Sequence, residues 1–200
     1  MRAICIAALL GLLIAASNAN AQPVGAYPEQ LVKPGTGGHV INGCGPEAFM
    51  VNREKRFADN HSYKFGVDRG EYVTYTVNFR DSCNLHDVGY QQAYFVQTAP
   101  GTWIRDPLVY NKIRGDYVNY TNMSRAEVDQ RFLVDMQAQC EQQIRQQTPT
   151  TTVGRLAPRS SQDRAVALCK GRAATMHGLV REFGRSAYKE GPQRLNDRGD

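Results

Sequence analysis

Two stretches of alternating apolar and polar residues predict a β-hairpin in the first half of the chain. From Glu71 to Phe79 an apolar side chain falls on every second residue, which is the period of a strand with one buried face. The segment from Tyr63 to Val67 precedes it, and Gly70 between them can adopt the positive φ of a short hairpin loop. We therefore expect these two segments to pair as antiparallel strands.

Three later segments carry apolar residues at three- and four-residue spacing, which predicts helices. The first covers about residues 82–96. The second begins at Ser124, which forms a capping box with Glu127, and the third covers about 161–183 and ends before Gly184, a residue typical of helix termini. We expect a polar loop at the end of the second helix, where Gln and Thr are frequent between residues 137 and 152.

The connection between the first two predicted helices, residues 98–123, is long and lacks clear periodicity. It carries Trp103 and three tyrosines, at positions 110, 117 and 120. A structureless loop of this length is unusual in a compact domain, so we expect the segment to be either partly ordered or functional.

The two ends of the chain are expected to lie outside the folded domain. Arg2 is followed by an apolar run from Ala3 to Ala16 and by the A-x-A site that ends at Ala21, which together predict a secretory signal peptide over residues 1–21, cleaved near Ala21/Gln22. The run of about 14 residues is shorter than the roughly 20 that cross a bilayer, and no later run is longer, so we expect no transmembrane segment. Residues 22–38 are rich in Pro and Gly and predict a flexible leader, and residues 185–200 predict a charged tail.

Charge and composition narrow the class of protein. The 200 residues include 24 Lys and Arg and 19 Asp and Glu, and loss of Arg2 with the signal peptide would leave a net charge of about +4. This excess is too small and too dispersed for a dedicated nucleic-acid binder, but it suits an anionic surface such as phospholipid. The apolar content favours one domain, at residues 39–184, with a thin core. The predicted signal peptide implies that this domain is secreted to the extracellular space or the periplasm.

Four cysteines remain after signal-peptide removal, and an even number in an exported protein predicts disulfides. They are Cys44, Cys83, Cys140 and Cys169. Two disulfides have three possible connectivities, and spacing alone leaves all three open. A zinc site is disfavoured because no two of these cysteines lie two to four residues apart.

The strongest candidate for chemistry is the adjacent pair His86 and Asp87 on the first predicted helix. Neighbouring helical residues point about 100° apart, so the imidazole and the carboxylate can perform adjacent tasks without pairing with each other. Cys83 lies one turn before His86, and a disulfide there would hold that turn in place. For an isolated His-Asp pair, an unremarkable surface role would be the favoured interpretation.

The surrounding residues favour a functional role, because the stretch resembles the active-site helix of the secreted phospholipases A2. The signature Cys-x-x-His-Asp-x-x-Tyr of that family is matched by Cys83, His86, Asp87 and Tyr90. The segment from Val128 to Cys140 is similar to the second long helix of the bacterial and fungal branch, and the segment from Leu168 to Gly184 is similar to its closing helix. The resemblance covers roughly residues 42–184, with 47–79 and much of 92–123 as insertions.

The resemblance implies a fold and a site. The fold would be mostly α, with two antiparallel disulfide-linked helices, a third packed helix, a calcium-binding loop and a β-hairpin insertion. His86 would be the general base for water, oriented by Asp129, and Ca²⁺ would be held by Asp87 and by the Asn42-Gly43 turn. The implied disulfides are Cys44–Cys83 and Cys140–Cys169. The implied activity is calcium-dependent hydrolysis of the sn-2 ester of glycerophospholipids at a membrane surface, by a monomer that binds no nucleic acid.

Two other readings remain open at this stage. Asn42 stands where a carboxylate would be the stronger calcium ligand, so the chain could be a catalytically weak or silent relative that binds membrane or protein. In the other reading, a secreted structural or adhesion domain, the ordered occurrence of His86, Asp87 and Asp129 would be accidental. A serine lipase is disfavoured because no G-x-S-x-G occurs in the chain.

Overall fold

The computed structural model describes residues 24–33, 38, 40–41, 43–44, 59–66, 70–91, 93–147, 159–185 and 188. The predicted signal peptide, residues 1–21, lies outside the described residues. In chain order the elements are β1 (Gly25–Ala26), η1 (Pro28–Gln30), β2 (Asn60–Gly66), β3 (Tyr72–Asn78), α1 (Arg80–Gln91), β4 (Phe95–Ala99), β5 (Thr102–Arg105), β6 (Leu108–Asn111), β7 (Asp116–Val118), α2 (Arg125–Gln146) and α3 (Arg159–Phe183).

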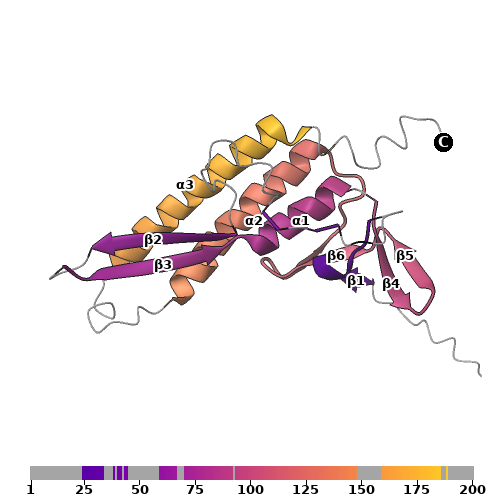
Figure 1. Cartoon of the computed structure of the whole chain (residues 1–200), viewed down its shortest axis with the longest axis horizontal. Helices are drawn as coiled ribbons and strands as arrows, with labels where there is room; N and C mark the ends of the chain where they lie inside the picture. Colours follow the sequence, from indigo (N-terminus) through magenta and orange to yellow (C-terminus); the bar gives the residue numbers. More distant parts are fainter. Residues whose placement is uncertain are drawn as a thin grey trace, which may run out of the picture.

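Helix α2 is the centre of the molecule, and it packs against both α1 and α3 (Figure 1). Its N-cap is Ser124, whose side chain accepts a hydrogen bond from the Glu127 main-chain N–H while the Glu127 carboxylate accepts one from the Ser124 main-chain N–H. This reciprocal cap is the one that the sequence predicted. The disulfide Cys140–Cys169 joins α2 to α3, and Cys44–Cys83 joins the segment before β2 to α1, so both predicted pairings are present.

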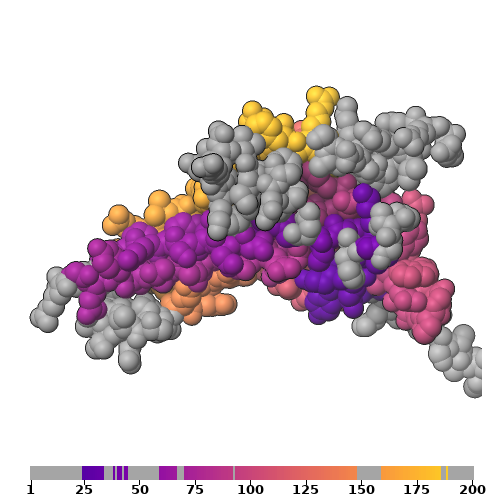
Figure 2. All heavy atoms as spheres, in the orientation of Figure 1, coloured from indigo at the N-terminus to yellow at the C-terminus, as the bar shows by residue number. Residues whose placement is uncertain are grey.

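The predicted hairpin is confirmed as the antiparallel pair β2–β3. Its register pairs Tyr63 with Tyr75, and the alternation buries Val73, Tyr75 and Val77 against α2 and α3. Figure 2 shows the surface of this hairpin extending to one end of the molecule, with β4 and β5 at the opposite end. The hairpin therefore supplies one face of the core that α2 and α3 share.

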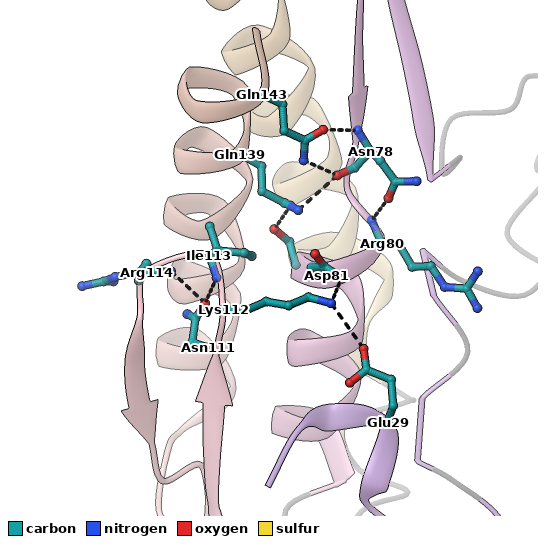
Figure 3. A network of polar contacts seen from close by, with 11 residues as sticks. Glu29, Asn78, Arg80, Asp81, Asn111, Lys112, Ile113, Arg114, Gln139 and Gln143 are labelled. Carbon is teal, nitrogen blue, oxygen red and sulfur yellow. Dashed lines mark hydrogen bonds and ion pairs between the residues drawn. The ribbon is translucent and has the colours of Figure 1, made fainter. Parts of the chain in front are cut away.

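Glutamines on α2 bind the main chain of β3 along the edge that β2 leaves unpaired. Gln143 accepts a hydrogen bond from the Asn78 main-chain N–H at 2.8 Å and donates one to its carbonyl at 2.9 Å (Figure 3). Gln139 and Gln147, one turn to either side, bind the main chain of Asn78 and Thr76. The Gln-rich segment expected to be a loop is thus helical as far as Gln146. Its side chains bind main-chain groups of β3 that a third strand would otherwise pair with.

The other end of the molecule is built from short strands. The sheet β1-β6-β7 pairs β1 in parallel with β6, and β4 and β5 form a separate hairpin. Residues 24–33, expected as a flexible leader, contribute β1 and η1 and bury Ala26 and Leu31. Lys112, in the turn after β6, lies 2.8 Å from the Asp81 carboxylate and 3.6 Å from that of Glu29 (Figure 3).

The prediction of a mostly α fold with one hairpin insertion is wrong. Three helices share the described residues with seven strands in three small sheets. The first helix ends at Gln91 rather than near Val96. Residues 95–118 form four strands, so the connection expected at 98–123 is ordered over most of its length. The reason is tertiary packing: Val96, Val109 and Val118 belong to a core cluster with Leu85 and Val88 of α1. No helix in the described part of the chain is long and apolar enough to cross a membrane.

Candidate functional site

His86 lies on the face of α1 that meets α2, with Cys83 one turn before it and Tyr90 one turn after it on the same face. All three side chains are buried, as the three- and four-residue spacing requires for one helical face. The His86 ring packs 4.0 Å from the Tyr90 ring and 4.6 Å from the Phe132 ring of α2, measured between centroids. Tyr90 and Phe132 belong to the two different hydrophobic clusters of the protein, so His86 sits where the two cores meet.

The predicted partner of His86 is in place. The Nε2 atom of His86 lies 3.1 Å from Oδ1 of Asp129, and the Tyr90 hydroxyl donates to the same oxygen at 2.6 Å. Asp129 is 1% exposed, and its Oδ2 atom has no hydrogen-bond partner among the described residues. Burying an ionised carboxylate is costly unless it is hydrogen-bonded, so the charged state of Asp129 depends strongly on the donors His86 and Tyr90.

The protonation states of the pair follow from its surroundings. Burial alone would raise the pKa of Asp129, but the hydrogen bonds from His86 and Tyr90 lower it below its ordinary value. Burial lowers the pKa of His86, against the opposing hydrogen bond and charge of Asp129. Near neutral pH the carboxylate is therefore ionised and can only accept, so Nε2 of a neutral His86 carries the proton and Nδ1 keeps its lone pair.

A glycine makes the close approach of α1 and α2 possible. A Cβ atom at Gly89 would lie 2.4 Å from a methyl group of Val128 and 3.0 Å from the ring of Tyr120. Val128 directly precedes Asp129, so the space left by this missing side chain lets the carboxylate reach His86. Sequence reasoning missed Gly89, although a glycine inside a helical pattern is itself a signal of close packing.

The predicted calcium ligands are only partly within the described residues. Asp87 is half-buried on α1, and Gly43 is adjacent to Cys44, which is bonded to Cys83 one turn before Asp87. Asn42 lies outside the described residues. Among the residues that the structure describes, no three His, Cys, Asp or Glu side chains converge as a metal-binding group. A calcium ion at Asp87 would therefore depend on main-chain carbonyl oxygens for its other protein ligands.

The turn at Gly43 has features that suit such a role. Its φ of +78° is in the left-handed region, and a Cβ there would lie 3.1 Å from the Asp59 carboxylate. Asp59 Oδ1 accepts the main-chain N–H of Cys44 at 3.0 Å, which holds the turn. Carboxylate and carbonyl oxygens are the donors that Ca²⁺ prefers, so the chemistry of Asp87 and of the Gly43 carbonyl fits that ion.

A second acidic residue of α2 was placed wrongly by the sequence. Asp135 follows Asp129 by six residues, which on a helix turns it about 120° away and predicts an exposed or arginine-paired side chain. In the structure it is 1% exposed and accepts hydrogen bonds from the Asn111 amide at 3.1 and 3.2 Å. Asn111 in turn accepts from the main chain of the turn that joins β6 to β7. Asp135 therefore fixes this hairpin to α2 and lies apart from the His86 pair.

His177 on α3 is a further histidine whose pKa the charges of the pair affect. Partial burial lowers its pKa, and the charge of Asp129 opposes this effect. His177 is half-buried and takes no part in the described hydrogen bonds of Asp129. It therefore adds a titratable group whose charge acts on the pair.

Comparisons with known proteins give no direct parallel. No protein-family model, no curated protein and no solved structure matches the chain. The arrangement of His86, Asp129 and Tyr90 is therefore the main indication of function.

Proposed function

We propose that the protein is a secreted, calcium-dependent phospholipase A2 that hydrolyses the sn-2 ester of glycerophospholipids. The observation that carries the proposal is the buried hydrogen bond between His86 Nε2 and Asp129 Oδ1, which Tyr90 shares. Three residues separated along two helices, each the type that the phospholipase A2 resemblance implies, meet at one point. Two disulfides in a chain with a predicted signal peptide are consistent with secretion.

His86 has the state that a general base needs. Its Nδ1 lone pair can take a proton from water as the water oxygen attacks the ester carbonyl carbon, and Asp129 stabilises the imidazolium that forms. The same proton can then pass to the leaving oxygen when the ester C–O bond breaks. A positioned base of this kind contributes on the order of 10² to 10⁴ in rate.

Asp87 and the Gly43 carbonyl would hold the calcium ion, with Asn42 as the further ligand that the resemblance implies. When bound, the ion would supply positive charge for the oxygen that becomes negative in the transition state. The disulfide between Cys44 and Cys83 would keep the Gly43 turn close to α1. The calcium ligands would then keep a fixed position relative to His86, which binds the attacking water.

The test is hydrolysis of phospholipid vesicles labelled in the sn-2 chain, in calcium and in excess chelator. We expect labelled fatty acid to be released only with calcium, and expect His86→Ala to release almost none. Asp163→Asn, which alters an exposed carboxylate near the start of α3, is the matched control and should keep full activity. If the folded protein released no fatty acid, or if His86→Ala were as active as the unaltered protein, the proposal would fail.

A catalytically silent, lipid-binding protein is one outcome of the same experiment. It would bind the vesicles in a flotation assay and leave both esters intact.

We expect the monomeric protein to act at the vesicle surface without a partner subunit, which light scattering of the active sample would check.

A further inference from the structure

The segment that follows α3 reaches back to the His86 pair. Tyr188 lies within the stretch predicted as a charged tail, yet it is 5% exposed and belongs to the core cluster that contains Tyr90 and Val128. Its main-chain N–H donates to the Gly184 carbonyl at 3.1 Å. An aromatic side chain from the end of the domain is therefore part of the core beside the site.

Tyr188 contacts both elements that hold Asp129 in place. Its ring meets the Tyr90 ring edge-on, with the centroids 5.3 Å apart. Its hydroxyl donates to the Met123 carbonyl at 3.0 Å, directly before Ser124, which caps α2. One side chain thus joins Tyr90 on α1 to the residue before the N-cap of α2, the helix that carries Asp129.

Tyr90 is consequently confined on three sides. His86 packs on its ring from one side and Tyr188 from another. At the third, Gly184 approaches so closely that a Cβ there would lie 2.6 Å from the Tyr90 hydroxyl oxygen. With the ring held in this way, the hydroxyl has little freedom to leave Asp129, to which it donates at 2.6 Å.

We propose that Tyr188 is a positioning residue for the His86–Asp129 pair: it fixes the Tyr90 hydroxyl on Asp129 and thereby fixes the carboxylate against His86. The inference deepens the proposed function, and its activity measurement rests on that function. The orientation of the imidazole can also be measured without hydrolysis. A phenacyl bromide alkylates an imidazole nitrogen with loss of bromide, and the rate depends on how the Nδ1 lone pair is presented.

The experiment compares Tyr188→Ala, Tyr188→Leu and Tyr188→Phe in the full chain. Phe keeps the ring contact with Tyr90 and loses only the bond to Met123, whereas Ala and Leu lose both, and Leu retains apolar volume. The matched control is Tyr75→Phe, which removes a buried hydroxyl bond to Ser161 at 2.9 Å in the other core cluster. Alkylation of His86 is followed by peptide mass spectrometry, and kcat and KM are measured on vesicles.

We expect Tyr188→Leu and Tyr188→Ala to lower kcat and the His86 alkylation rate by about 10-fold with little change in KM, because small displacements of a catalytic group reduce the rate steeply. Tyr188→Phe should recover most of both rates, and Tyr75→Phe should change neither. If Tyr188→Ala does not fold, the kcat and alkylation rate of Tyr188→Leu decide whether Tyr188 positions the pair.

A folded Tyr188→Leu that is alkylated at His86 as fast as the unaltered protein would overturn the proposal. An equal loss in Tyr75→Phe would also overturn it, because the effect would then be one of general stability. Failure of the unaltered protein to hydrolyse phospholipid would instead refute the proposed function, and the alkylation rates would still decide the role of Tyr188.

Discussion

The Nε2 atom of His86 lies 3.1 Å from Oδ1 of Asp129, although 43 residues separate them in the chain. The same oxygen accepts the hydroxyl of Tyr90, so one carboxylate oxygen binds two side chains of α1. This shared contact sets the tautomer of His86 and leaves Nδ1 as the basic atom. It is the relationship on which the proposed hydrolytic role depends.

Removal of either member of the pair should abolish most ester hydrolysis. We expect His86→Ala to lose roughly 10² to 10⁴ in rate, and Asp129→Asn to lose less, because an imidazole without its partner can still accept a proton part of the time. Asp135→Asn is the control, since Asp135 is a buried aspartate of the same helix that binds Asn111 instead. Vesicle assays of the three variants check this, and an active Asp129→Asn beside an inactive Asp135→Asn would show that the wrong carboxylate had been assigned.

A side chain at Gly89 should separate α1 from α2. In Gly89→Ala the new methyl group would meet Val128 at 2.4 Å, so we expect a loss of about 1 to 3 kcal/mol in the free energy of unfolding, together with reduced hydrolysis. The double variant Gly89→Ala, Val128→Ala should recover part of the stability and part of the hydrolysis, because it removes the Val128 methyl groups that the new side chain would meet. Gly171→Ala, at a helical glycine with nothing within 4 Å of its Cβ position, should leave stability equal or higher. Urea denaturation measures all three, and equal effects at Gly89 and Gly171 would contradict the close approach.

The two disulfides should differ in what their loss changes. They close loops with sequence separations of 39 and 29 residues, and removal of either as a Cys-to-Ala pair should cost about 4 kcal/mol by chain-entropy estimates. Loss of Cys44–Cys83 should also weaken calcium binding, because the Gly43 turn is no longer tied to α1. Loss of Cys140–Cys169 should leave calcium affinity unchanged at temperatures where the protein stays folded. Thermal unfolding and calcium titration separate the two effects, and an equal loss of calcium affinity in both would count against the Gly43 turn as a ligand.

Asp135 should make the stability of the protein depend on pH in the acidic range. Burial raises its pKa to about 6, against the hydrogen bond from Asn111 and the charges of Arg114 and Arg131, from an ordinary value of 3.8. Between these two values the folded state binds more protons than the unfolded state, so this residue's contribution to stability falls as pH rises, by roughly 3 kcal/mol over the whole range. In Asp135→Asn this slope should disappear. Urea denaturation of both proteins at pH 4.5 and 7 tests the sign, and identical slopes would contradict it.

The parts of the fold that the sequence predicted well are those with long, regular patterns. The alternation from residue 71 to 79 and the capping box at Ser124 are local signals, and each corresponds to an element of the structure. The strands at residues 95–118 are three to five residues long, too short for a clear period. Tyr94 falls four residues after Tyr90, so the helical spacing of the sequence continues beyond Gln91. In the structure, Phe95 at the start of β4 instead pairs with Val32.

Part of the site could be identified from residue type and spacing, and part could not. His86, Asp129 and Tyr90 were expected from the resemblance of two separate segments to phospholipases A2, and the structure brings the three side chains into contact. Tyr188 could not be identified, because nothing in a charged, Pro-containing segment indicates which aromatic residue returns to the core. The burial of Asp135 depends on where the β6–β7 turn packs, which helical periodicity does not encode.

Calcium titration beside hydrolysis, for the unaltered protein, His86→Ala and Asp87→Asn, tests the central claim most directly. A site with one carboxylate and neutral oxygens should bind in the weak range of extracellular modules, about 10⁻⁴ to 10⁻³ M. We expect His86→Ala to bind calcium normally and to be inactive, and Asp87→Asn to lose calcium binding and activity together, because it lacks the charged ligand. An Asp87→Asn protein that hydrolysed phospholipid rapidly without calcium, or a His86→Ala protein that kept full activity, would contradict the account.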